Sequence, residues 1–222
     1  APLVRFFLGV FAMIGALVFL GCPWRALLRL AGGDWNALTG LAGLATGIGV
    51  GVLFLKSGYS LGRAQTQKAA SGYLFPIFMA GLFLLVAFQV TFAEGGPIFF
   101  SQKGPGSQHA PLLISLGAGL LVGAISQRSR FCTMGALRDV ILLRDFHLMS
   151  GVAALLIAAL AMNVVLGQFK PGFAGQPIAH TDHLWNFLGM ALAGLAFALA
   201  GGCPGRQLFL SGEGDLDAGI FA

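Results

Sequence analysis

The sequence predicts an all-α, polytopic membrane protein: an inverted repeat of spanning helices, with short re-entrant helices at its cysteine motifs. Hydrophobic residues make up 57% of the 222 residues and charged residues only 9%, whereas soluble domains carry about 25% charged residues. Apolar runs recur that approach the roughly 20 residues a span needs. In addition, a Gly-Cys-Pro-x-Arg motif occurs twice, and an internal repeat constrains the whole fold.

The duplicated motif stands at Gly21-Cys22-Pro23-Trp24-Arg25 and at Gly202-Cys203-Pro204-Gly205-Arg206. Each copy follows an apolar run that opens with Phe-Leu-Gly, and each is followed by a Gly-Asp pair at the same distance from its cysteine. The likeness on both sides of the motif indicates duplication of a whole helical unit.

Six runs are expected to cross the membrane, and three pieces that follow or contain a cysteine are too short to cross. A seventh span begins and stops near Ala222, so we expect the chain to be part of a longer protein. The expected spans are Leu3–Leu20, Leu38–Leu55, Gly72–Phe92, Pro111–Ile125, Ser150–Leu166 and Leu184–Ala200, and the short pieces are Ala26–Ala31, Phe131–Arg144 and Cys203–Leu210.

Five crossings separate the first span from its repeat partner, so the two copies should have opposite orientations, as in many secondary transporters. The basic residues agree, because cytoplasmic loops carry an excess of Lys and Arg. We expect one transmembrane domain, with residues 1–56 in the first repeat, 57–110 as a linking span and outer loop, and 111–222 in the second repeat. The inner side would hold Arg5, Arg128, Arg130 and the Lys56–Lys68 loop, which contains Arg63. The outer side would hold the loop Glu94–Ala110, which contains Lys103, and the loop Gly167–His183, which contains Lys170.

The residues after each cysteine suggest an anion path. Pro23 and Pro204 mark helix breaks, because proline costs a helix interior a hydrogen bond but can begin a new helix. Cys22 and Cys203 would then face helix N-termini, where free N–H groups and the helix dipole favour an anion. Arg25 and Arg206, three residues after each cysteine, would lie close by. The structural alternative is that the cysteines act as small buried hydrophobes.

A third cysteine, Cys132, lies in Arg130-Phe131-Cys132-Thr133-Met134 and is followed by Arg138-Asp139. Its short segment after a span repeats the context of the other two cysteines, although Arg138 and Asp139 could simply neutralise each other. His109, His180 and His183 fall in the expected outer loops, where solvated histidines are a simpler reading than a metal site. No acid stands out within the membrane for proton coupling.

The segment Phe131–Asp139 together with Gly202–Arg206 resembles the YeeE/YedE sulfur-transport family, and within it most resembles the YedE-type selenium-transporter branch. The resemblance implies a multi-pass protein of the bacterial inner membrane that is not an enzyme. It also implies a row of cysteines along the path (Cys22, Cys132 and Cys203) and a small cytoplasmic sulfur carrier of the TusA-like type as a partner. Members normally carry a further Phe-Cys segment upstream of the first Gly-Cys-Pro, and this chain begins after that point.

These observations lead to the hypothesis of a transporter or facilitator for a small sulfur- or selenium-containing anion. The arginines would attract the anion and the cysteines would relay it by S–H contacts or transient S–S or S–Se bonds. A membrane thiol–disulfide oxidoreductase, with Cys132 and Cys203 forming a reversible disulfide, is the alternative. No cofactor is expected, because the sequence carries no phosphate, dinucleotide or haem motif, and no nucleic acid is expected despite the net charge of +5.

Overall fold

The computed structural model describes the whole chain except residues 1, 63–67, 91, 93–100, 102–106 and 109. Within the described residues the chain is all-helical, which confirms the predicted fold class, and six of its segments are long and apolar enough to cross a membrane. The helices are α1 Pro2–Phe19, α2 Pro23–Ala31, α3 Asn36–Lys56, α4 Ala69–Gly72, α5 Leu74–Ala87, α6 Leu112–Ser129, α7 Thr133–Leu143, α8 His147–Val165, α9 His183–Ala200, α10 Pro204–Gly212 and α11 Leu216–Phe221.

The predicted spans correspond to described helices, with differences at some ends. The third span ends at Ala87 instead of Phe92, because the backbone turns at Gln89, whose φ is 51°. The fifth begins three residues before Ser150, where the Asp145 carboxylate accepts the backbone N–H of His147 at 2.9 Å. Most of the predicted outer loop Glu94–Ala110, including Lys103 and His109, lies outside the described residues, as does Arg63 of the predicted inner loop.

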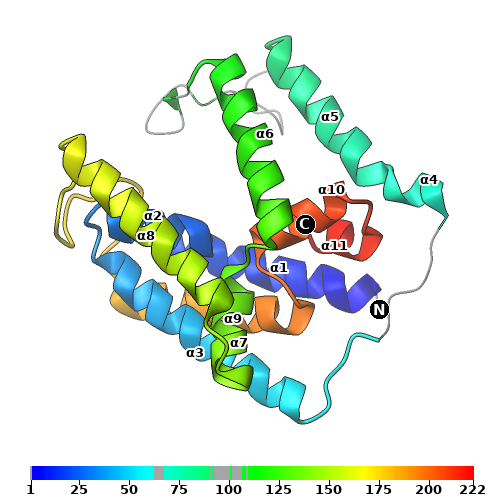
Figure 1. Cartoon of the computed structure of the whole chain (residues 1–222), viewed down its shortest axis with the longest axis horizontal. Helices are drawn as coiled ribbons and strands as arrows, with labels where there is room; N and C mark the ends of the chain where they lie inside the picture. Colours follow the sequence, from blue (N-terminus) through cyan, green and yellow to red (C-terminus); the bar gives the residue numbers. More distant parts are fainter. Residues whose placement is uncertain (1, 63–67, 91, 93–100, 102–106, 109) are drawn as a thin grey trace.

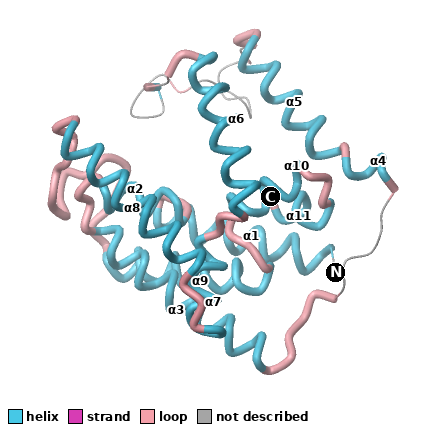
Figure 2. The backbone as a smooth tube through the Cα atoms, in the orientation of Figure 1, coloured by secondary structure: helices cyan, strands magenta, loops and turns pink. Residues whose placement is uncertain are grey.

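Helix α9 forms the centre of the core and packs against both α1 and α3 (Figures 1 and 2). Close approach to α3 is possible because Gly43 and Gly47 have no side chains: a Cβ at either would overlap the carbonyl oxygen of Phe187 or Ala191. Small residues permit this backbone contact, which is a common basis of helix association in membranes. The α3–α9 pair therefore forms a tightly fitted unit.

Helices α1 and α9, the predicted repeat partners, run antiparallel. Gly15 of α1 lies against Gly189 and Ala193, while Gly9, nearer the start of α1, lies against Phe221, whose ring packs on Phe197 near the end of α9. Two copies in opposite orientations require this arrangement. The inverted repeat itself stays a prediction.

The peripheral helices present apolar side chains outwards. Helix α5 and helix α8 contain no buried residue, and α6 contains only Ser126. Figure 1 shows α5 and α6 projecting away from the α1–α3–α9 core. A soluble protein rarely exposes such surfaces, whereas lipid solvates them, so this arrangement suits a multi-pass membrane protein.

A buried polar cluster ties α2 to the start of α3. Arg29 donates to the Asp34 carboxylate at 2.6 Å and to the Phe19 carbonyl at 3.0 Å. Asn36 donates its side-chain amide to Asp34 at 2.9 Å and to the Phe173 carbonyl at 2.7 Å. Asp34, only 3% exposed, is a buried acid that the sequence reading did not single out. Because it is paired with Arg29, it serves the structure of this end of the core.

Candidate functional site

All three cysteines begin short helices. Cys22, Cys132 and Cys203 are the N-cap residues of α2, α7 and α10, and each has an extended backbone. Pro23 and Pro204 occupy the first helical positions of α2 and α10, as their missing N–H and fixed φ favour. The first N–H groups of a helix lack partners within the helix. Each cysteine therefore stands where backbone donors and the positive end of the dipole favour an anion.

Cys132 and Cys203 are brought together, although they lie 71 positions apart in the chain. The backbone N–H of Cys203 points at the Cys132 sulfur at 3.5 Å, and the N–H of Gly135 donates to the same sulfur at 3.3 Å. The Cys203 thiol faces the side chains of Cys132 and Thr133. Both cysteines are free thiols and both are buried. The α7 and α10 N-termini thus meet at a pair of thiols.

Cys22 occupies a neighbouring position that is half-buried. It lines a cavity of about 390 Å³ together with Arg25 and with Pro204, the first residue of α10. The other lining residues are glycine or apolar, and five of them belong to α1. Arg25 is the charged side chain in this lining, so the cavity beside Cys22 has a positive character.

An aromatic cluster, which sequence reasoning missed, lies between the three cysteine helices. The Trp24 ring packs edge-on against Phe131 at a centroid separation of 5.3 Å and lies 5.8 Å from the Phe209 ring. The same ring rests on Gly205 of α10, where an added Cβ would be 2.9 Å from the indole. Trp24 and Gly205 are the variable positions of the two Cys-Pro-x-Arg motifs, and that difference between the repeats was the available signal.

The four candidate arginines differ in their surroundings. Arg206, in the first turn of α10, has a buried Nη1 that no acceptor within the described chain satisfies. Arg25 is exposed and lines the Cys22 cavity. Arg138 forms an ion pair with Asp139 at 2.8 Å, as one reading of the sequence held. Arg130 is exposed and ends α6 in a left-handed conformation, with φ 52°. The geometry thus favours Arg25 and Arg206 as anion-attracting groups.

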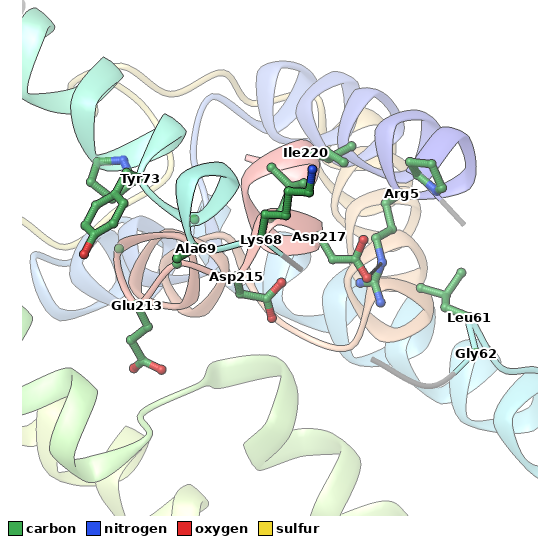
Figure 3. A pocket seen from close by; sticks show the side chains of 16 residues that line it. Arg5, Leu61, Gly62, Lys68, Ala69, Tyr73, Glu213, Asp215, Asp217 and Ile220 are labelled. Atoms are coloured by element: carbon green, nitrogen blue, oxygen red, sulfur yellow. Dashed lines mark ion pairs between the residues drawn. The ribbon is translucent and has the colours of Figure 1, made fainter. Parts of the chain in front are cut away.

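A larger cavity of about 910 Å³ lies away from the cysteines, at the start of α1 (Figure 3). Arg5 and Lys68 line it together with three acids, Glu213, Asp215 and Asp217, so acids outnumber bases there. Two of the acids have structural partners: Asp217 pairs with Arg5 at 3.0 Å, and Asp215 accepts the N–H of Ala218 at 3.1 Å to cap α11. This lining is ill-suited to an anion, and the cysteine region is the better candidate.

The histidines of the second outer loop contact protein groups. His180 Nε2 lies 2.7 Å from the Val18 carbonyl, and the His183 ring packs edge-on against Phe173. In the part of the chain that the structure describes, no group of three His, Cys, Asp or Glu residues could hold a metal ion.

Comparison with known proteins agrees with the resemblance drawn from the motifs. The family model described as "Sulphur transport" matches residues 128–222, which include Cys132 and Cys203. The match confirms the resemblance to the YeeE/YedE sulfur-transport family. It does not bear on the selenium branch.

Two curated relatives are each named "Thiosulfate transporter TsuA". The protein of Escherichia coli (strain K12) is 32% identical over 104 residues, which is 46% of this chain and 29% of the relative. The protein of Spirochaeta thermophila (strain ATCC 700085 / DSM 6578 / Z-1203) is 32% identical over 96 residues, 43% of this chain and 28% of the relative. The matched segment thus spans less than a third of each relative. No solved structure matches the chain. The six segments that are long and apolar enough to cross a membrane, together with the E. coli relative, support the predicted multi-pass inner-membrane location.

Proposed function

We propose that this chain is the membrane-embedded part of a transporter for a small sulfur-containing anion such as thiosulfate. The observation that carries the proposal is that three cysteines each cap a short helix and that two of these helix starts meet. The family match and the relatives' printed name supply the substrate class. On this view the chain moves its substrate unchanged and is not an enzyme.

The chemistry of the path follows from its donors. Helix N-termini bind anions through free N–H groups and the dipole. Burial strengthens these interactions, because the local dielectric is low. Thiosulfate carries a terminal sulfur that sulfate lacks, and a thiol can contact that sulfur through a weak S–H interaction. The Cys22, Cys132 and Cys203 thiols would therefore favour reduced sulfur anions, while Arg25 and Arg206 supply the attraction of charge.

The proposed repeat divides the path into two halves. We propose that residues 1–56 and 111–222 form the two halves of an inverted repeat, linked by residues 57–110. Cys22 would then serve one half of the path, and Cys203 with Cys132 the other. In such folds the substrate site lies between discontinuous helices near the membrane midplane, and the cysteine-capped starts of α2 and α10 are of this kind.

The proposal is tested by uptake into proteoliposomes that contain the full-length protein. Radiolabelled thiosulfate should accumulate, radiolabelled sulfate should not, and Cys203→Ala should abolish most of the thiosulfate uptake. Thr46→Ala is a matched control, because Thr46 is exposed and its hydroxyl donates to Ala42 of its own helix at 2.9 Å. Equal uptake by the wild-type protein and a variant with all three cysteines replaced by alanine would contradict the cysteine path.

A membrane thiol–disulfide oxidoreductase is the second candidate, and the contact between Cys132 and Cys203 favours it. Disulfide formation would release two electrons and two protons, so this activity needs a quinone or flavin as acceptor. Quinone reduction that depends on Cys132, in protein that accumulates no thiosulfate, would favour this candidate.

Two finer parts of the proposal rest on the family resemblance alone. Selenium compounds are tested by adding labelled selenite to the same uptake assay. A TusA-like carrier is tested by titrating that protein onto the full-length transporter in nanodiscs, where saturable binding is expected.

A further inference from the structure

The two copies of the Gly-Cys-Pro-x-Arg motif differ at the variable position x, and the two residues at that position are in contact. The first copy has Trp24 and the second has Gly205 between proline and arginine. The Trp24 indole lies on Gly205, so closely that a Cβ at Gly205 would be 2.9 Å from ring atom Cζ2. The large residue of one repeat thus occupies the space that the small residue of the other leaves.

The place that Trp24 fills is the junction of the three cysteine helices. Trp24 follows Cys22 by two residues, and its ring contacts Phe131, the residue before Cys132. Its contact with Gly205 is two residues after Cys203. Trp24 therefore packs against residues that lie close in the chain to Cys132 and to Cys203.

The junction holds buried donors without acceptors. Indole Nε1–H can only donate, and the Trp24 Nε1 is buried and unpartnered among the described residues. The same is true of Arg206 Nη1. The Thr133 hydroxyl is also buried, with the residue 4% exposed, and it faces the Cys203 thiol. Native proteins leave few buried donors unsatisfied, because each costs desolvation energy. Two such donors, on helices that meet where Trp24 lies on Gly205, suit a ligand that supplies acceptors, as an oxyanion does.

We propose that Trp24 is an anion-binding residue of the path, whose indole N–H donates a hydrogen bond to an oxygen of the anion as it passes from Cys22 to Cys203. This inference rests on the proposed transport function. The indole ring excludes water from the junction, and its N–H, with Thr133 and Arg206, replaces part of the hydration that the anion loses. A purely structural Trp24 would need the ring but not the N–H.

Trp24→Phe separates the two roles, because phenylalanine keeps an aromatic ring and lacks the donor. We expect Trp24→Phe to raise the KM for thiosulfate uptake about tenfold, equivalent to about 1.4 kcal/mol. Trp185→Phe is the matched control, since Trp185 is 57% exposed on α9, and its KM should be unchanged. An unchanged KM in Trp24→Phe would overturn the inference while leaving the transport function intact.

A binding measurement keeps the test independent of transport and of the variant's folding. This chain contains three tryptophans, and in full-length wild-type protein labelled with ¹⁵N at the indole positions each of them should give one N–H resonance in nanodiscs. Thiosulfate should shift the Trp24 resonance, assigned by its loss in Trp24→Phe or in Trp24→Tyr, and equimolar sulfate should shift it less. A Trp24 resonance that thiosulfate leaves in place would overturn the inference. Absence of uptake by the wild-type protein would instead reject the transport function, and the resonance would still report whether the anion binds.

Discussion

Gly47 offers a direct test of the packing that joins the two halves of the core. In Gly47→Ala, the new methyl group would overlap the carbonyl oxygen of Ala191, a backbone atom that cannot move aside by rotation. Overpacking of this kind costs about 1–3 kcal/mol. The opposing gain in helix propensity from Gly to Ala is at most about 1 kcal/mol.

Gly49 supplies the control, because it lies on the same helix two residues away and a Cβ there meets no atom within 4 Å. Gly49→Ala gains the same propensity without the overlap, so the difference between the two variants isolates the packing cost. At about 2–4 °C per kcal/mol for a chain of this size, Gly47→Ala should melt about 2–12 °C below Gly49→Ala. The assay is thermal unfolding of the full-length protein in one detergent, followed by circular dichroism. Equal melting temperatures, or a higher one for Gly47→Ala, would refute the close α3–α9 contact.

Three further outcomes are expected. Arg29→Ala should lower the free energy of unfolding by about 3–5 kcal/mol, because it leaves the buried Asp34 carboxylate without its partner. Arg138→Ala, whose ion pair with Asp139 is partly exposed, should lower it by about 1 kcal/mol or less. Urea unfolding in mixed micelles compares the two variants, and equal losses would contradict the buried pair. A small maleimide should modify the half-buried Cys22 faster than Cys132 or Cys203, as peptide mass spectrometry would show; faster modification of the buried pair would refute this placement. Mild oxidation should link Cys132 to Cys203 and neither to Cys22, and a dominant cross-link to Cys22 would disprove the pairing.

Much of the fold could be predicted from the sequence, because the signals involved are local. Apolar runs bounded by charges and glycines mark helices wherever lipid is the solvent, and the Gly-Cys-Pro order places proline at a helix start. The sequence predicts an end of the third span that is too late, because apolar residues continue beyond Gln89 while the helical backbone conformation does not. An apolar composition predicts that a segment lies in lipid, but it does not predict where the helical hydrogen bonds of that segment end.

Long-range contacts could not be predicted in the same way. The meeting of Cys132 with Cys203 joins residues 71 positions apart, and no local pattern encodes that distance. The burial of Asp34 was missed because its partner, Arg29, sits in a segment that reads as a short amphipathic helix. The sequence does not single out Trp24, because one aromatic residue among many apolar ones carries no signal without its contact to Gly205.

The backbone connection between Gly32–Trp35 and Lys170–Gly172 limits how the proposed transporter could move. Lys170 and Gly172 donate to the carbonyls of Gly32 and Gly33 at 2.9 and 3.0 Å, and Trp35 donates to the Gly172 carbonyl at 3.1 Å. These bonds fasten the segment before α3 to the loop before α9. Rocking the predicted first repeat as a rigid body against the predicted second repeat would break all three bonds. A transport cycle that keeps them must change access elsewhere, by movement of the short cysteine-capped helices or of the peripheral helices α5, α6 and α8 around a fixed α3–α9 frame.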